Sequence, residues 1–274
     1  TWSGCSGITT FPLINTSSGT NFQGTWRDCT GLTLFPLIDT SSATTFQNTW
    51  YNCDGLTSFP QIDTSSGTNF QSAWEGCSGI TTFPLINTSN GTSVREAWNG
   101  CSGLTSFPLI NTSNSTDFIR SWSSCSGITS FPALNFSNGT DFTEAWRSNA
   151  FTSFPSVDFS SATTFRDTWR SCTLLTTYPA NQFDTTGTLA SVAFHFAFHA
   201  SAFNAQSLEN ILTSLDTNGA QNITLNMSSG QNANASTWST DAIIAHTNLI
   251  NKGWTITESG TPSMSDLELS LIHI

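Results

Sequence analysis

Charge is the first thing that this sequence has little of. Asp, Glu, Lys and Arg make up 9% of its 274 residues, compared with roughly a quarter of an average soluble domain. Lys and Arg together number 7, and Asp and Glu number 18, which gives a formal net charge of −11 at pH 7. Because binding to phosphate groups depends on clustered cations, the chain is a poor candidate for binding nucleic acid or an anionic membrane surface.

Long apolar runs, an initiator Met, a signal peptide and catalytic motifs are absent as well. No apolar run approaches the ~20 residues that span a bilayer, so we expect no membrane span. There is no Gly-x-Ser-x-Gly elbow, phosphate-binding loop or His-Glu-x-x-His motif, which predicts that the protein is not an enzyme and needs no cofactor. We interpret the chain as a fragment or processed product whose N-terminal region, with any targeting signal, is missing.

Large aromatic residues, by contrast, are abundant and regularly spaced, with 10 Trp and 21 Phe. Tryptophan recurs every 24 residues and once more after a one-residue deletion, at Trp2, Trp26, Trp50, Trp74, Trp98, Trp122, Trp146 and Trp169. A ninth, degenerate unit carries Phe194 at the Trp position and Phe203 at the Phe position. A fixed period in the twenties predicts a repeat solenoid, in which each coil buries one face against the next.

Each coil follows the consensus W-x-x-C-x-G-[IL]-T-x-F-P-x-[IL]-[ND]-T-S-x-x-T-x-F-x-x-x-W. The stretch "LTSFP" is typical of a short strand that ends at Pro, which lacks an N–H. The stretch "NTSSG" is typical of a turn. In "TNFQGTWRDC" we expect a short helix, with Thr20 as N-cap and Gln23 completing a capping box, and with Phe22, Trp26 and Cys29 on one face.

Residues at one position of the repeat are called a column here, and we expect the apolar columns to stack as ladders inside the coils. The predicted ladders are those of Trp26, Trp50, Trp74, Trp98 and Trp122 and of Cys29, Cys53, Cys77 and Cys101. Free buried thiols are preferred over disulfides, because the chain has 7 Cys, an odd number, and because Asn149 replaces Cys in this column. A metal is less favoured still, since the repeat has no Cys-x-x-Cys and no clustered His.

The spacing "SSGTNF…TW…C…LT…FP…IDTSS" resembles the repeats of the BspA-like leucine-rich-repeat surface proteins, in particular their bacterial lipoprotein branch. The resemblance covers Trp2 to about Phe203, although this chain has Trp where the family usually has Phe and Phe-Pro where it has a Leu-rich strand. It implies a right-handed α/β leucine-rich-repeat-like solenoid of about nine coils, each with a short strand, a turn and a short helix. It also implies adhesion at a cell surface or as a secreted protein, without catalysis. Similar repeats occur in tail-fibre-like proteins of environmental bacteria and phages.

We divide the chain into a solenoid over residues 1–203, C-terminal capping units over 204–260 and an irregular tail over 261–274. In the capping units we expect a helix from Ser207 to Gly219, a strand at "NITLNM", a helix ending at Gly253 and a strand at "WTIT". Such a cap covers the last apolar layer of a solenoid. The end of the tail resembles translated sequencing-adapter read-through, so we expect it not to be native structure; a real apolar tail is the alternative.

Two groups of residues raise the question of metal binding. The column of Asn15, Asp39 and Asp63 could offer oxygen ligands to Ca²⁺, but Asn and Asp also cap turns through their own backbone, and we favour this second interpretation. His195 and His199 lie four residues apart, which is a weak metal signal, and we favour two polar positions on the last regular coil. No metal site is therefore predicted.

Two columns consist of Thr alone, one starting at Thr9 and one at Thr20. An exposed Thr array could order water, which raises ice binding as an alternative function. Caps and inward-facing strand hydroxyls explain a uniform column equally well. An ice-binding face would also need neighbouring Thr columns, and the column of Thr10, Leu34 and Ser58 is mixed. We therefore place ice binding behind adhesion.

The remaining surface column begins Leu13, Leu37, Gln61, Leu85 and Leu109. If it faces solvent it forms an apolar stripe, which usually marks a partner site; if it is buried it is core. The candidate partner-binding face consists of Thr10, Pro12, Leu13, Leu34, Leu37, Gln61, Leu85 and Leu109.

The sequence thus predicts a non-catalytic, surface-displayed adhesion solenoid that recognises a protein or glycan on a cell surface. We expect it to be extracellular, on a cell surface or on a virion. The alternatives are a purely structural spacer of a large surface or tail-fibre protein, and an ice-binding protein.

Overall fold

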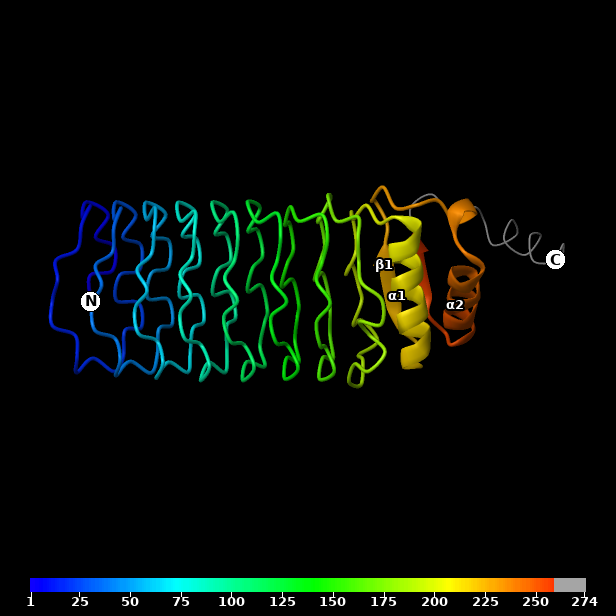
Figure 1. The fold of residues 1–274 in the computed structure, drawn as a ribbon, viewed down its shortest axis with the longest axis horizontal. Coiled ribbons are helices and arrows are strands. Elements are labelled where there is room, and N and C mark those ends of the chain that lie inside the picture. Colours follow the sequence, from blue (N-terminus) through cyan, green and yellow to red (C-terminus); the bar gives the residue numbers. More distant parts are fainter. Residues whose placement is uncertain (259–274) are drawn as a thin grey trace.

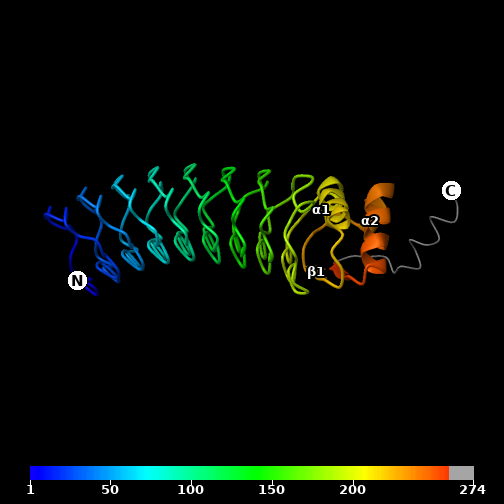
Figure 2. The same cartoon turned by 90° about the horizontal axis from the view of Figure 1, so that it is seen from below.

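Successive coils lie side by side along the length of the molecule. The structure is a computed structural model that describes residues 1–258, so the tail expected at 261–274 lies outside the described residues. Figure 1 shows the chain passing from the N-terminal coils, in blue, through a row of similar turns to two helices at the other end. Seen from below (Figure 2), neighbouring coils keep the same path, and the helices α1 (Ala205–Asn218) and α2 (Thr240–Asn251) are adjacent to each other beyond the last coil.

Neighbouring coils are joined by parallel backbone bridges between residues of the same column. An unbroken line of these bridges joins Asn21, Thr45, Asn69, Ser93, Asp117, Asp141 and Thr164. Parallel pairing holds adjacent chain segments about 4.8 Å apart in the hydrogen-bonding direction. This ladder fixes the register of one 24-residue coil on the next, because every bridge joins equivalent positions.

The short helix expected in each coil is wrong, and a pair of tight turns takes its place. In the first complete coil, Thr25 N–H donates to the carbonyl oxygen of Phe22 (3.0 Å) and Cys29 N–H to that of Trp26 (3.4 Å). The third residues of these turns, Gly24 and Asp28, both have a φ of 59°, which is the signature of a type II turn. No helix is present between residues 1 and 203.

The backbone donors of these turns point along the stack. Trp26 N–H donates to the carbonyl oxygen of Thr49 at 2.9 Å, and Gly24 N–H to that of Gln47 at 2.9 Å. The expected capping box is also wrong. Asn21 Oδ1, and not Thr20, accepts the Gln23 N–H (2.8 Å). Because the neighbouring coil supplies a carbonyl acceptor for each of these N–H groups, the segment does not need the i→i−4 hydrogen bonds of a helix. Phe22, Trp26 and Cys29 still face inward, but the backbone hydrogen bonds run between coils.

The strand expected at "LTSFP" is reduced to single bridges, Thr10 with Leu34 and Ser153 with Thr177. Each is accompanied by one backbone bond of the adjacent Thr column, such as Thr33 N–H to the Thr9 carbonyl oxygen (2.9 Å). The Pro that follows each Phe has no N–H to donate, so a continuous ladder cannot extend through this segment. The main bridge ladder therefore lies on the other side of the coil, at the Asn21 column.

The core is a set of aromatic columns. The rings of Trp26 and Trp50 are 5.8 Å apart and 7° from parallel, and those of Trp74 and Trp98 are 5.6 Å and 7°. The Phe rings of the neighbouring column meet the indoles edge-on; the rings of Phe83 and Trp98, for example, are 5.5 Å apart at 84°. The ladder indoles from Trp26 to Trp169 are buried, and their Nε1 atoms have no hydrogen-bond partner. Packing, and not hydrogen bonding, holds them in place.

All seven cysteines are free. Cys53 Sγ donates to the carbonyl oxygen of Trp26 at 3.0 Å, and Cys101 Sγ to that of Trp74 at 3.1 Å. These thiols therefore link their own coil to the backbone of the coil before it, at the Trp carbonyl. Burial raises the pKa of Cys53 to about 12.

The C-terminal part contains the regular elements. Helix α1 spans Ala205–Asn218 and ends at Gly219 (φ 79°). Strand β1 (Thr224–Met227) pairs in parallel with strand β2 (Thr255–Glu258). Between them lie the 3-10 helix η1 (Ala235–Thr237) and helix α2 (Thr240–Asn251). Within residues 1–258, neither helix combines the length and apolarity needed to cross a bilayer.

Helix α1 begins before Ser207, where the sequence predicts its start: the N-cap is Asn204, whose side chain accepts the Ser207 N–H. Ser207 is instead buried in the first turn, where its Oγ accepts the Tyr178 N–H at 2.9 Å. Both residues are good cap formers, so the sequence alone could not choose between them. The hydroxyl of Ser207 attaches α1 to the preceding coil.

Candidate functional site

The Leu13 column faces solvent. Leu13, Leu37, Leu85 and Leu109 keep between 55% and 74% of their surface exposed. Their neighbours explain this orientation, since Phe35 and Ile38, on either side of the Pro36–Leu37 pair, are buried. The question left open by the sequence is thereby answered: this column is surface and not core.

The leucine row is not continuous. Gln61 interrupts it, and its Nε2 donates to the backbone carbonyl oxygen of Leu85 at 2.9 Å. Leu34 is 53% exposed and its backbone forms a parallel bridge with that of Thr10. Thr10 and Pro12 are exposed on the same segment of the first coil. The residues of the candidate face thus belong to the same short segment of their coils, with exposed apolar side chains at Leu13, Leu34 and Leu37 and again at Leu85 and Leu109.

Both Thr columns are also exposed, from Thr9 to Thr176 and from Thr20 to Thr163. The expectation of inward-facing hydroxyls is wrong. The Thr33 hydroxyl donates to the carbonyl oxygen of Thr9 at 3.0 Å, and the Thr44 hydroxyl to that of Thr20 at 3.2 Å. The hydroxyl protons thus point along the stack while the side chains lie on the surface.

The Asn/Asp column caps turns, as favoured from the sequence. Asn15 Oδ1 accepts the Ser17 N–H at 3.1 Å, and Asp63 Oδ1 accepts the Ser65 N–H at 2.9 Å. The hydrogen bonds from Ser65 lower the pKa of Asp63. No group of three or more His, Cys, Asp or Glu side chains with the geometry to hold a metal occurs in the described part of the chain.

His195 and His199 lie on the last regular coil, beside the ring of Phe196. Burial, together with the nearby Arg170, lowers the pKa of His199. The Arg170 guanidinium lies over the Phe196 ring, 5.0 Å from its centre. The two imidazoles are thus part of an aromatic and cationic surface cluster.

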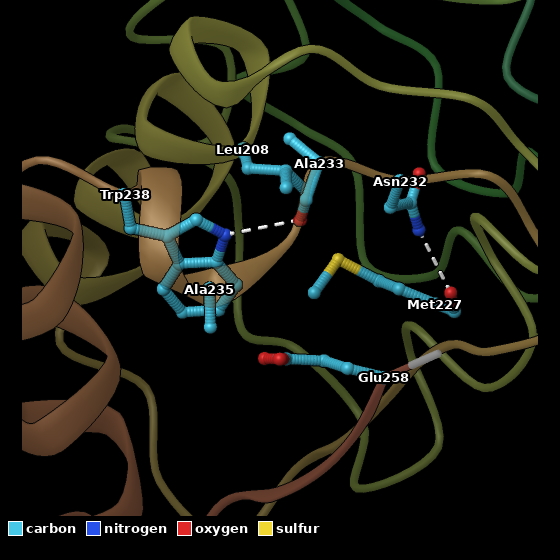
Figure 3. Close-up of a pocket in the computed structure, with 7 residues that line it drawn as sticks. All are labelled: Leu208, Met227, Asn232, Ala233, Ala235, Trp238 and Glu258. Atoms are coloured by element: carbon cyan, nitrogen blue, oxygen red, sulfur yellow. Dashed lines mark hydrogen bonds between the residues drawn. The ribbon is translucent and has the colours of Figure 1, made fainter. Parts of the chain in front are cut away.

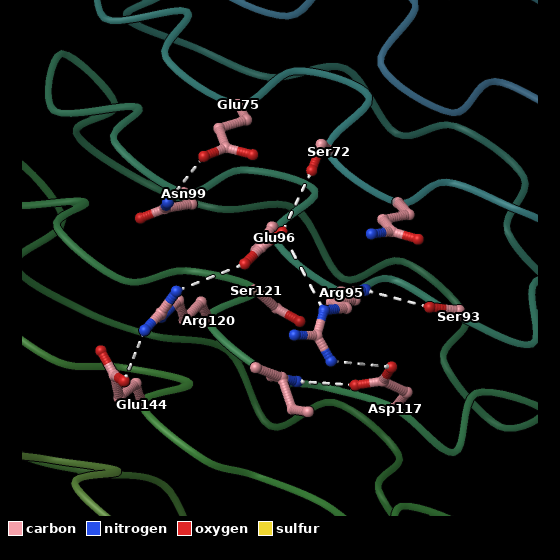
Figure 4. A network of polar contacts seen from close by, with 12 residues as sticks. Ser72, Glu75, Ser93, Arg95, Glu96, Asn99, Asp117, Arg120, Ser121 and Glu144 are labelled. Atoms are coloured by element: carbon pink, nitrogen blue, oxygen red, sulfur yellow. Dashed lines mark hydrogen bonds and ion pairs between the residues drawn. The ribbon is translucent and has the colours of Figure 1, made fainter. Parts of the chain in front are cut away.

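Charged residues gather on the paired tight turns of each coil, residues 22–29 in the first complete coil, which we call the tandem-turn face. This feature is not among those predicted from the sequence. Figure 4 shows Arg120 between two carboxylates, with an ion pair of 3.5 Å to Glu96 and one of 2.8 Å to Glu144. Glu144 also pairs with Arg147 at 2.8 Å. Burial works against ionisation of Glu144, but the two Arg lower its pKa overall. All Arg residues of the chain lie in the turn segment of their repeats, which was the signal available in the sequence.

A small cavity lies in the C-terminal part between η1, β1 and the end of β2 (Figure 3), lined by Leu208, Met227, Asn232, Ala233, Ala235, Trp238 and Glu258. The Glu258 side chain points into it, and its Oε1 lies 3.4 Å from His246 Nε2. Burial raises the pKa of Glu258 to about 7 and lowers that of His246. Trp238 Nε1 donates to the carbonyl oxygen of Ala233 (3.3 Å), which fixes the indole wall of the cavity.

No protein-family model, curated protein or solved structure matches this chain. What can be said of its function therefore depends on the surfaces described above: an apolar leucine row, two exposed Thr columns and a self-neutralised charged face.

Proposed function

We propose that the chain is a repeat solenoid related to the BspA-like leucine-rich-repeat surface proteins, and that it acts as a non-catalytic adhesion module. Its partner is a protein or glycan on a cell surface, and its location is extracellular, on a cell envelope or a virion. The leucine row carries this proposal. The row is interrupted at Gln61, but its other members are exposed Leu side chains, and exposed apolar side chains grouped on one surface favour a partner site.

The scaffold supports the same interpretation. Stacked indoles and interlocked backbone bridges make a stiff rod, and a stiff support holds Leu13, Leu37, Leu85 and Leu109 at fixed separations. Full burial of a Leu side chain contributes about 1.5–3 kcal/mol. A few such contacts are sufficient for specific binding when the backbone that carries the side chains is already rigid, because little backbone freedom is then lost on association.

The test compares two matched double variants of the full chain. Leu85→Ser with Leu109→Ser changes the leucine row, and Thr92→Ser with Thr116→Ser changes another exposed column in the same two coils. Labelled wild type is applied to a panel of immobilised glycans and to intact bacterial cells. The leucine variant is expected to lose the binding that the wild type and the threonine variant retain.

If the wild type binds neither the glycans nor the cells, adhesion is contradicted and the structural spacer is favoured. Equal binding by both variants would show that a partner is bound elsewhere than on the leucine row. In each case the near-ultraviolet circular dichroism of the Trp stack reports whether the fold is intact.

A further inference from the structure

The Thr20 column has a neighbour on the surface that the repeat consensus conceals. Two residues before each Thr of this column stands a Ser or Asn, and the residue between them is small and faces the core. The pairs are Ser18 and Thr20, Ser42 and Thr44, Ser66 and Thr68, Asn90 and Thr92, Asn114 and Thr116, Asn138 and Thr140, and Ser161 and Thr163. The Ser or Asn is the last central residue of a tight turn; in one coil, for example, the Gly67 N–H closes this turn by donating to the carbonyl oxygen of Thr64 at 2.9 Å. The Thr follows two residues later and is exposed as well, so the two columns are adjacent on the surface. We call them together the Ser/Thr face.

The inward residue between the two columns has to be small. A Cβ on Gly67 would lie 2.6 Å from the Phe70 ring, and one on Gly139 would lie 2.4 Å from the Phe142 ring. Ala43, Ser115 and Ala162 carry a Cβ at the equivalent position and are fully buried, so some coils accommodate a small side chain there, but none larger than Ser occurs. The surface above it is therefore held directly against the rigid stack.

Side chains of the Ser/Thr face are fixed by hydrogen bonds to the preceding coil. The Thr68 hydroxyl donates to the carbonyl oxygen of Thr44 at 3.1 Å, and the Thr92 hydroxyl to that of Thr68 at 3.2 Å. In the second column, Asn90 Nδ2 donates to the carbonyl oxygen of Ser65 at 2.7 Å. A hydroxyl whose proton is used in this way still has its acceptor lone pairs. The hydroxyls of the Thr20 column that are held in this way are those of Thr44, Thr68, Thr92, Thr140 and Thr163. These coils present to solvent an oriented oxygen and a methyl group with little rotamer freedom left to lose.

The Ser/Thr face carries no charge. Every position of its two columns is Ser, Thr or Asn, whereas the Arg and Glu side chains of Figure 4 belong to the tandem-turn segment. A fixed charge forces nearby water dipoles to point toward or away from it. Neutral oxygens and methyl groups leave the first water layer free to adopt a tetrahedral, hydrogen-bonded arrangement.

We propose that the Ser/Thr face binds ice. Water molecules held by successive Thr oxygens repeat at the coil spacing of about 4.8 Å, and the parallel Ser/Asn column turns this row into a two-dimensional array. A periodic, rigid and uncharged array of acceptors and methyl groups fits the surface of a crystalline solid better than a small ligand. Ice is favoured over a crystalline polysaccharide because no aromatic side chain, on which a sugar ring could stack, occurs in these two columns. The column of Thr10, Leu34 and Ser58, which weakened this idea in the sequence, lies on a different segment of the coil.

The test measures thermal hysteresis and the inhibition of ice recrystallisation with the full chain. Thr68→Tyr with Thr92→Tyr places two bulky rings on the Ser/Thr face. The matched control, Thr57→Tyr with Thr81→Tyr, changes the other Thr column in the same coils. Wild type and control are expected to show thermal hysteresis, the difference between the melting and freezing temperatures, and the first variant is expected to lose it.

Absence of both activities from the wild type, at any concentration at which it is soluble, would overturn the proposal. An equal loss in the control would also overturn it, since the activity would then not belong to this face. Thr68→Ser with Thr92→Ser keeps the hydroxyls and removes the methyls with little risk to folding, and we expect it to reduce the gap without abolishing it. Binding of glycans or cells through the leucine row is tested separately, so the two proposals can fail independently.

Discussion

Asn149 donates a hydrogen bond from its Nδ2 to the carbonyl oxygen of Trp122, at 2.9 Å. Cys125, one coil earlier in the same column, donates from Sγ to Trp98 in the same way, at 3.0 Å. An amide can replace a thiol here because the position requires a buried donor directed at the preceding coil, and not a sulfur atom. The column is therefore a hydrogen-bonding element between coils.

Thiol labelling follows from this role. The native protein at pH 8 is expected to react with iodoacetamide at Cys5, which is only partly buried, and not at the six other cysteines. Burial raises the pKa of Cys125 and of Cys172 to about 12, so the reactive thiolate is scarce as well as inaccessible. Mass spectrometry counts the labels, and all 7 cysteines should be labelled in guanidinium. Native labelling at Cys77 or Cys101 would contradict the buried ladder.

The indole stack predicts a graded response at one rung. Trp98→Ala is expected to cost about 3–5 kcal/mol, because it leaves a void between Trp74 and Trp122. Trp98→Phe should cost clearly less, since it keeps a ring in the stack and removes an N–H that has no partner. As a surface control, Leu109→Ala should stay within about 0.5 kcal/mol. Thermal and urea denaturation check all three, and a Trp98→Ala protein as stable as the wild type would refute the stack.

Gly100 and Gly103, three residues apart, are glycine for different reasons: the first for its backbone conformation and the second for lack of space. Gly100 has a φ of 75° and nothing closer than 3.7 Å to an added Cβ, while an added Cβ on Gly103 would lie 2.3 Å from the backbone oxygen of Ser78. Gly100→Ala is expected to cost about 1 kcal/mol, from the left-handed backbone alone. Gly103→Ala should cost more, about 1–3 kcal/mol or above, because neighbouring coils have to separate. Equal melting temperatures of the two variants would contradict the close approach of coils at Gly103.

The sequence could predict which residues face inward, but not the backbone that places them there. Phe22, Trp26 and Cys29 fit one stripe of a helix, and in tandem type II turns they face inward as well, so periodicity does not separate the two structures. The two structures differ at the third residue of the first turn, which has a positive φ in the turn but not in a helix. Gly24 at this position is compatible with a turn, but later coils have Glu96 (φ 56°) and Arg120 (φ 53°) there. Such residues are good helix formers, and their conformation is imposed by bonds to the next coil.

Surface columns were harder to predict, because their exposure depends on the turn geometry and not on residue type. Leu13 is apolar and exposed, while Thr40 and Thr64 are polar and buried. The buried threonines donate to the carbonyl oxygen of the next coil's Asp or Asn, as Thr64 does to Asn87 at 2.6 Å. A Thr column can therefore lie on either side of the chain, and its residue type alone does not show which.

Glu258 gives the C-terminal part a dependence on pH. Its folded pKa of about 7 lies above the ordinary value of 4.5, so protonation favours the folded state. The stability that this group contributes is fully present below about pH 4.5 and is lost as the pH rises through 7. Its size is at most about 3 kcal/mol, from 1.36 kcal/mol for each pKa unit. His246, 3.4 Å away, has a lowered pKa and contributes to the pH dependence in the opposite direction.

Glu258→Gln removes the titrating carboxyl group and leaves His246 unchanged. The free energy of unfolding of the variant should therefore rise relative to that of the wild type between pH 5 and pH 8. Urea denaturation at the two pH values measures this difference, and a difference that stays constant, or that grows in favour of the wild type, would contradict a buried and protonated Glu258.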